Sequence, residues 1–350
     1  MIRADPTVDA GADDEPDTDR YSQRMKTGAE FVLDTPADLD PLWGVGDQVL
    51  WASGESLLLV GPTGVGKSTL AIQLLAGRLG LLDTVLGLPV KTADRPVLYL
   101  AMDRPRQLIR AMRRVFNEHH RQLIDELLVV WDRPLPLDLG RVPEQLIDIA
   151  IAAGAGTVFV DSVKDAAVKL TDDEVGGNVN RARQYAIAEG IELVELHHQR
   201  KGQGGSRPTS LEDVYGSTWI TAGAGSVVLL WGAAGDPLVE LLHLKQPAGE
   251  VGPLKIEHDH ATGTSTVYPG QVDPLTALRH APGGLTSTDL ARLVSESERP
   301  TDNSRKKAQR MLERLVSEGL AHRVGDYQRG GSDGSAAARY VAVTDRPEQP

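Results

Sequence analysis

Short apolar runs alternate with amphipathic segments through the middle of the chain. Between the early runs, apolar residues recur at helical spacing, as in "KSTLAIQLLAGRL" and "VNRARQYAIAEG". Apolar strands that alternate with helices predict a largely parallel α/β sheet covered on both faces. The strand-like runs are "SLLLV" (56–60), "PVLYLAM" (96–102), "ELLVVW" (126–131), "TVFVDS" (157–162), "IELVEL" (191–196), "SVVLLW" (226–231) and "LVELLHL" (238–244).

The pattern also sets the limits of this domain. Residues 1–28 contain many Asp, Pro, Thr and Gly but almost no apolar residues, which predicts a disordered acidic tail. The α/β domain is expected over residues 29–270. Its last strands have short connections, so we expect an antiparallel extension at one edge, and "HDHATGTSTVYPG" (258–270) reads as a closing hairpin.

Residues 271–350 have a different pattern, with three amphipathic segments followed by two short strand-like runs. Gly319 follows the third amphipathic segment, where a helix stop is expected. Three helices followed by a β-hairpin predict a winged helix-turn-helix domain. Arg305, Lys306 and Arg310 share roughly one face of its third helix, where they would contact DNA, although such domains also bind proteins.

Composition narrows the class of protein. The chain has 350 residues, a net charge of −12 and no cysteine, which excludes disulfides and thiolate metal sites and favours the cytoplasm. No apolar run approaches the roughly 18 residues of a membrane span, and the N-terminus lacks the apolar stretch of a signal peptide. The acidic balance argues against a passive coat on nucleic acid, but it allows a local basic channel.

One motif carries specific chemistry. "GPTGVGKST" follows an apolar strand and opens a helix, so glycines curl the loop and its N–H groups face an anion at the helix N-terminus. Lys67 is expected on the phosphates and the Ser68 hydroxyl on Mg²⁺. We therefore expect ATP to bind at Gly61, Pro62, Thr63, Gly64, Val65, Gly66, Lys67, Ser68 and Thr69.

Two aspartates follow other strands. Asp161 ends "TVFVD" and is placed to hold Mg²⁺ through water. Asp103 follows "VLYLAM", a strand that we expect beside the phosphate-loop strand, where a carboxylate would orient the attacking water. The alternative for Asp103 is an N-cap of the next helix.

Residues 41–270 resemble the RecA-like ATPases of the DnaB and RepA replicative-helicase group, and most closely the helicase-like ATPases of actinobacterial phages and plasmids. The motifs that carry the resemblance are "GPTGVGKST", "VLYLAMD", "TVFVDS", "LHHQRKG" and "VYGSTWITAGAGSVVLL", in this order. It implies a P-loop NTPase core, ATP and Mg²⁺ as cofactors, and a hexameric ring that moves on single-stranded DNA during replication, together with replication partner proteins. Asp103 stands where the family has a catalytic glutamate.

The stretch "ELHHQRKGQGGSRP" (195–208) takes its meaning from this resemblance. His198 is similar to the family's sensor of the γ-phosphate. Neighbouring strand residues point to opposite faces, which argues against His197 and His198 binding one metal ion. Arg200, Lys201 and Arg207 would form a mobile cationic loop facing DNA, and the alternative is a solvated surface loop.

The chain departs from the family at one place. Lys245 matches a family lysine, but Pro247 stands where an arginine that reaches the neighbour's nucleotide is expected. Lys245 remains the candidate for that trans-acting role. The missing arginine favours a second function, a recombination mediator or loader that switches with nucleotide, and a third is an ATP-controlled DNA-binding regulator.

An H-x-H pair and two tryptophans allow more than one interpretation. His258 and His260 have a spacing that can bind zinc, but no third ligand is suggested nearby, so a surface hairpin is expected. Trp43 and Trp51 precede the first core strand, where packing under the sheet edge competes with stacking on adenine.

Overall fold

The computed structural model describes residues 25–200, 208, 210–268, 274–279, 281, 283–295, 297–317, 319–324 and 338–343. Residues up to Asp40 form one unit, and residues from Pro41 onward form another. In the described part of the first unit, Glu30–Asp34 form a short helical turn, and the Phe31 side chain is 66% exposed. Among the described residues, burial begins at Leu42.

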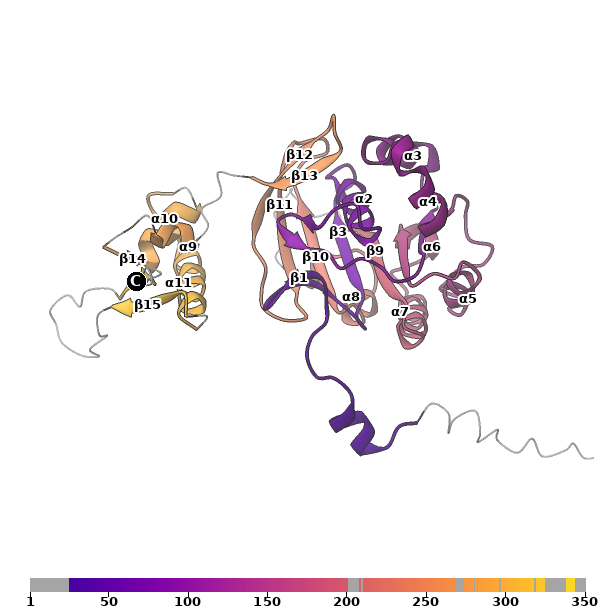
Figure 1. Ribbon diagram of the computed structural model, residues 1–350, viewed down its shortest axis with the longest axis horizontal. Coiled ribbons are helices and arrows are strands. Elements are labelled where there is room, and N and C mark those ends of the chain that lie inside the picture. The colour runs from indigo at the N-terminus through magenta and orange to yellow at the C-terminus, as the bar shows by residue number, and fades with distance from the viewer. Residues whose placement is uncertain are drawn as a thin grey trace, which may run out of the picture. The chain divides into compact units, whose positions relative to one another are not determined.

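The second unit is built on a nine-stranded sheet (Figure 1). The strands from β10 to β7 are parallel, and β11, β12 and β13 add an antiparallel extension. This confirms the largely parallel sheet and its antiparallel edge, and it is consistent with a RecA-like core. The strands lie in the order β13 (Thr264–Val267), β12 (Leu254–Asp259), β11 (Leu238–Lys245), β10 (Ser226–Trp231), β3 (Leu57–Gly61), β9 (Glu192–His198), β8 (Thr157–Asp161), β6 (Val97–Ala101) and β7 (Leu128–Trp131).

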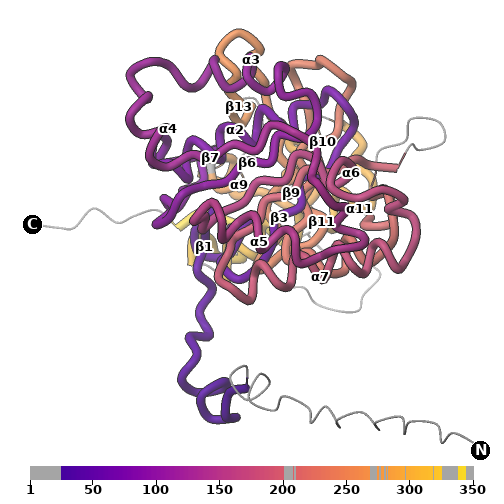
Figure 2. Tube along the Cα trace, turned by 90° about the vertical axis from the view of Figure 1, so that its right-hand side faces the viewer, coloured from indigo at the N-terminus to yellow at the C-terminus, as the bar shows by residue number. Residues whose placement is uncertain are grey.

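Helices cover both faces of this sheet, because alternate strand residues are apolar on each side. In β3, Leu57 and Leu59 pack in one core and Leu58 and Val60 in the other. Figure 2 shows the two helix layers on opposite sides of the strands. The first layer contains α2 (Lys67–Arg78), α3 (Pro105–Val115) and α4 (Arg121–Leu127), and the second contains α5 (Gln145–Ala152), α6 (Val163–Ala166), α7 (Asp173–Ala188) and α8 (Thr218–Ala222).

Two short hairpins add residues to the core that lies between the sheet and the layer of α2, α3 and α4. They are β1 (Pro41–Val45) with β2 (Gln48–Ala52), and β4 (Thr84–Val85) with β5 (Leu88–Pro89). Trp43 and Trp51 are fully buried in this core, and their indole N–H groups donate to the carbonyls of Val85 and Glu55. Packing is therefore their role, and stacking on adenine is excluded for both.

One expectation about the strand order is wrong. The strand before Asp103, β6, does not neighbour β3, because β9 and β8 lie between them. The later strands of the chain insert beside β3, and a local sequence pattern carries no information about such crossovers.

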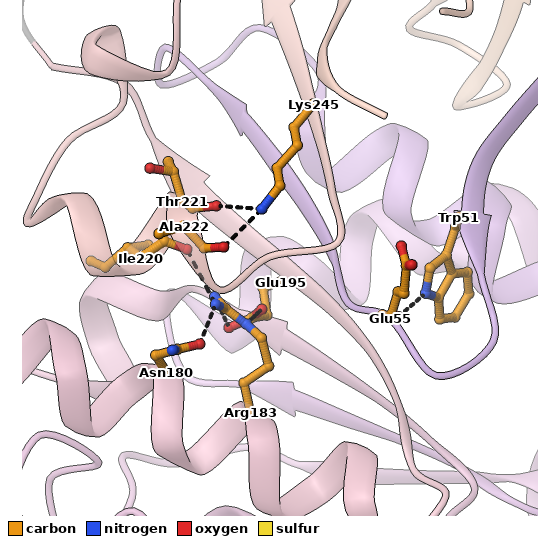
Figure 3. Close-up of polar contacts among 9 residues, drawn as sticks. All are labelled: Trp51, Glu55, Asn180, Arg183, Glu195, Ile220, Thr221, Ala222 and Lys245. Atoms are coloured by element: carbon orange, nitrogen blue, oxygen red, sulfur yellow. Dashed lines mark hydrogen bonds and ion pairs between the residues drawn. The ribbon is translucent and has the colours of Figure 1, made fainter. Parts of the chain in front are cut away.

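The central strand β9 carries charged residues on both faces. Arg183 of α7 binds Glu195 with two hydrogen bonds, Nε–Oε2 at 2.7 Å and Nη2–Oε1 at 3.2 Å. Asn180 Oδ1 and the Ile220 carbonyl accept from Arg183 Nη1 at 3.2 Å each (Figure 3). Arg183 and Glu195 are 1% and 5% exposed, so this ion pair is buried and its hydrogen-bonding groups are matched.

The C-terminal residues form a separate core of their own. Gly319 has a φ of +73° and its N–H donates to the Val316 carbonyl, so it ends the third helix as expected. No helix among the described residues combines the length and apolar character needed to cross a membrane. The elements of this part are α9 (Pro274–Arg279), β14 (Leu285–Thr286), α10 (Ser287–Ser295), α11 (Asp302–Ser317), β15 (Ala321–Val324) and β16 (Arg339–Ala342).

Breaking the buried pair of β9 should destabilise the fold strongly. Glu195→Gln leaves the Arg183 charge buried without its counter-ion, and we expect the free energy of unfolding to fall by about 3–5 kcal/mol. The matched control is Glu189→Gln at the exposed C-terminal end of α7, which should change the free energy of unfolding by less than about 0.5 kcal/mol. Urea denaturation compares the two, and equal shifts in midpoint would show that the pair is unimportant.

Candidate nucleotide site

The loop between β3 and α2 forms the predicted phosphate site. Gly64 and Gly66 have φ values of +81° and +99°, a left-handed backbone that glycine adopts readily. Gly66 is the N-cap of α2, and no side chain caps this helix. The helix N-terminus, with its unsatisfied N–H groups and positive dipole, is therefore open to an anion.

Lys67 is folded back against the loop. Its Nζ donates to the carbonyls of Gly61 at 2.9 Å and Pro62 at 2.8 Å, and the residue is 8% exposed. Burial lowers the pKa of Lys67 to about 8, although the carboxylate of Asp161 acts in the opposite direction. A phosphate would favour the charged form, so the ammonium is poised to be stabilised by a ligand.

Ser68 and Asp161 come together as the motif predicts. Asp161 Oδ2 accepts hydrogen bonds from Ser68 Oγ at 3.3 Å and from the buried hydroxyl of Tyr99 at 2.9 Å. Burial raises the pKa of Asp161, while these hydrogen bonds and Lys67 lower it. Hydroxyl and carboxylate oxygens suit Mg²⁺, and a cation would relieve the burial of this carboxylate, so the two residues fit the ion.

A cavity of about 460 Å³ opens over the loop. It brings together residues from five segments of the chain: the phosphate loop, the end of β6 with helix α3, the end of β8, the end of β9, and the turn after β12. Gly61, Pro62 and Val65 form the back of the loop and do not line it. The lining consists of Thr63, Gly64, Gly66, Lys67, Ser68, Thr69, Asp103, Arg104, Gln107, Leu108, Arg110, Ala111, Arg114, Asp161, Ser162, His198 and His260.

Asp103 lies in this cavity although β6 is distant from β3. It follows the strand beside β8, and its backbone N–H and that of Met102 reach the Asp161 carbonyl at 3.4 and 3.1 Å. The alternative role as a helix cap is wrong, because the N-cap of α3 is Arg104 and no side chain caps that helix. The half-exposed carboxylate lies 3.5 Å from Arg104 Nε, and its role in orienting water stays a prediction.

The two adjacent histidines point to opposite faces of β9. His198 pairs with Gly61 across the strands and lines the cavity, and burial followed by the charge of Lys67 lowers its pKa. His197 is buried on the other face, where its Nε2 donates to the Tyr215 carbonyl at 2.6 Å. Burial lowers the pKa of His197 to about 4, so its ring is neutral at pH 7. The two rings cannot hold one metal ion, because they lie on opposite faces of the strand.

Comparison with known proteins assigns the family. The sequence pattern of the AAA domain family matches residues 18–204, which include the phosphate loop, β6, β8 and β9. The chain belongs to the AAA domain family. With the loop and the Ser68–Asp161 pair, it is a P-loop ATPase. No curated protein matches the sequence. A similar solved structure is the KaiC-like protein PH0186 from Pyrococcus horikoshii OT3, with 16% identity, 67% of this chain and 100% of that chain covered, and a TM-score of 0.46.

Helix α3 adds cations to this AAA domain that sequence reasoning missed. Arg110 and Arg114 stand one turn apart and line the cavity, and Arg104 joins them from the helix start. The signal was present in "RPRQLIRAMRRVF", whose basic residues recur at helical spacing. Without the strand order, however, nothing indicated that this helix covers the phosphate loop.

His258 also differs from expectation. It is 3% exposed and packs behind the phosphate loop, so the expected surface hairpin is wrong for this residue, while His260 is exposed at the cavity. Among the described residues, no three His, Asp or Glu side chains gather as a metal site would require.

The trans-acting candidate lies away from the cavity. Lys245 Nζ donates to the carbonyls of Ala222 at 2.7 Å and Thr221 at 3.4 Å, at the end of α8 (Figure 3). Lys245 pairs with Val227 at the start of β10, whereas the phosphate loop follows the end of β3, which is parallel to β10. Lys245 thus lies at the end of the strands opposite to the end that carries the nucleotide site of the same chain.

The expected DNA contacts are only partly described. Arg200 is exposed just beyond β9, and its backbone N–H donates to the Asp213 carbonyl at 2.8 Å. Lys201 and Arg207 lie outside the described residues. Arg305, Lys306 and Arg310 are exposed on α11, and Arg305 is paired with Asp302. Lys306 and Arg310 lie opposite the buried Ala308 and Leu312, whereas Arg305 is on the flank of that buried face.

Nucleotide affinity should depend on the protonation of Lys67. Its pKa of about 8 in the free protein rises when phosphate binds, so affinity should be full below pH 8 and fall as pH rises further. Lys67→Arg stays charged and should give a weaker but flat profile between pH 7 and 9.5. Equilibrium binding of a fluorescent ATP analogue measures both, and a flat wild-type profile would contradict the expectation.

The arginines of α3 should contribute to ATP binding. Arg110→Ala with Arg114→Ala removes two cations from the cavity, and we expect affinity to fall by about tenfold or more, roughly 1.4 kcal/mol. Arg106→Ala with Arg113→Ala removes the same charge from exposed positions of α3 outside the lining. Calorimetric titration with ATP analogue compares the pairs, and similar losses would show only a general effect of charge.

Proposed function

We propose that this ATPase is a RecA-like motor of the DnaB and RepA type, which acts as a hexameric ring on single-stranded DNA in phage or plasmid replication. One observation carries the proposal. His198 lines the nucleotide cavity, and Arg200, two residues later, is exposed just past the same strand end. A nucleotide-dependent shift at His198 would therefore be passed directly to a cation available to phosphate.

Residues of the chain have separate tasks in this proposal. Lys67 and the loop N–H groups bind the phosphates, Asp103 orients water, and His198 responds to loss of the γ-phosphate. Ser68 and Asp161 would hold Mg²⁺, which neutralises charge that develops on the phosphates. The hydrogen bond from the Arg200 N–H to Asp213 fixes the start of the DNA-contacting loop to the segment before α8.

The C-terminal part is proposed to be a winged helix that contacts DNA. Its support is the exposure of Arg305, Lys306 and Arg310 on α11, which packs in the core of this part through Ala308 and Leu312. Its near-balanced charge makes the electrostatic attraction weak, so a contact with a replication partner protein is the competing role.

A specific observation favours a second function. Lys245 donates hydrogen bonds to carbonyls of its own chain, and position 247 is proline. Arg104, Arg110 and Arg114 line the nucleotide cavity of the same chain. These features suit a mediator or loader that switches with nucleotide without moving along DNA. A DNA-binding regulator is the third function, and it requires sequence-specific binding of duplex DNA.

Three assays on the full chain separate these functions. A motor hydrolyses ATP faster with single-stranded DNA and displaces a complementary strand, whereas a mediator binds DNA with ATP but displaces nothing. Selective binding of one duplex sequence supports the regulator. Lys67→Ala is the negative control for turnover. Absence of both DNA stimulation and strand displacement in the wild type would reject the motor.

Arg200→Ala should weaken binding of single-stranded DNA. The loss of one phosphate contact should reduce the slope of log affinity against log salt by about 0.7. Arg181→Ala, an exposed arginine on α7, removes the same charge elsewhere and should leave the slope unchanged. Fluorescence anisotropy with a labelled oligonucleotide across a salt series decides, and an unaltered slope in Arg200→Ala would make the loop a solvated surface feature.

A further inference from the structure

Two carbonyl groups of the phosphate loop, those of Gly64 and Val65, are bonded to residues outside the loop. A loop can turn its N–H groups toward an anion only if its carbonyl oxygens find partners elsewhere. The Gly64 carbonyl accepts from the N–H of Gly235 at 3.0 Å, and the Val65 carbonyl accepts from His258 Nε2 at 3.1 Å. Both donors belong to the antiparallel extension, beyond the residues that match the AAA domain family.

Hydrogen bonds fix the orientation of the His258 ring. Because a carbonyl only accepts, Nε2 must carry the proton, and the Ser265 hydroxyl then donates to Nδ1 at 2.7 Å. Ser265 is itself held by Gln73 of α2, whose Oε1 accepts from the Ser265 N–H at 2.8 Å. The ring therefore connects β12, β13 and the phosphate loop through matched polar groups.

The same ring also fills the space beside Gly66. A Cβ atom at this position would lie 2.3 Å from His258 Nε2, closer than atoms can approach. Figures 1 and 2 both place β13 beside α2, so the hairpin supports the loop and the helix that follows it. His258 thus fixes the loop by packing as well as by its hydrogen bond.

We propose that His258 is a positioning residue for nucleotide binding: it holds the Val65 carbonyl away from the ligand so that the N–H groups of the loop converge on the phosphates. The β12–β13 hairpin is then part of the nucleotide site, although no residue of its strands lines the cavity. This role depends on ATP binding at the loop and is independent of the proposed action on DNA.

The test compares two substitutions at one position in the full chain. His258→Leu replaces the ring with an apolar side chain of similar size that has no donor, and we expect the Kd for ADP and for ATP analogue to rise about tenfold. His258→Gln retains an N–H donor on a side chain of similar reach, and it should restore affinity to within about threefold of the wild type. Binding is measured with fluorescent nucleotides, and thermal melts without nucleotide report stability.

A matched control separates positioning from stability. Ile256→Ala removes a buried side chain from the same strand but keeps the hydrogen bond from His258 to the Val65 carbonyl, so it should lower the melting temperature but leave nucleotide affinity within about twofold. Equal affinity in wild type and His258→Leu, or an equal loss in Ile256→Ala, overturns the role of His258. If the wild type binds no ATP analogue, nucleotide binding at the loop is itself wrong.

Discussion

Burial of a parallel sheet on both faces confines polar chemistry to the ends of its strands. β3 and β6 are buried along their whole length, so side chains from the middle of these strands do not line the cavity. Tyr99, in the middle of β6, only supports the site through its buried hydroxyl, which donates to Asp161. Asp161 and His198 are accordingly the last residues of β8 and β9, and Asp103 lies just beyond β6. The cavity over the phosphate loop is where these ends meet, because the parallel strands all finish at one edge.

The strand β9 shows how that constraint is relaxed. Glu195 lies in the middle of the strand and is tolerated because Arg183 binds it with two hydrogen bonds. Two residues later, His197 is kept neutral by burial. The face of β9 opposite the nucleotide site therefore carries two polar side chains, Glu195 and His197, that are both buried and hydrogen-bonded.

A feature of the site can be predicted from the sequence when a few neighbouring residues determine it, and it cannot when its partners are far away in the chain. The phosphate loop and Asp161 were predictable, because a loop of fixed spacing and a carboxylate at a strand end are each defined by a few neighbouring residues. The place of β6 in the sheet was not, since crossovers are decided by packing of distant segments. His258 and the arginines of α3 were not predicted for the same reason, because their partners lie far away in the sequence. In addition, an H-x-H pattern does not show which histidine is buried and which is exposed.

Whether the cations around the nucleotide come from the same chain or from a neighbouring chain decides how strongly hydrolysis depends on assembly into a ring. In a ring that supplies a cation from the neighbour, an isolated subunit lacks part of its site. Here Lys67, Arg104, Arg110 and Arg114 all line the cavity of a single chain, together with Asp103 and Asp161. Lys245 meanwhile caps α8 of its own chain and would have to leave two carbonyls to reach a neighbour. Cations that can bind the phosphates thus lie within one chain. In the proposed ring, nucleotide binding would therefore be separable from assembly, and a neighbouring subunit would adjust turnover rather than complete the phosphate site.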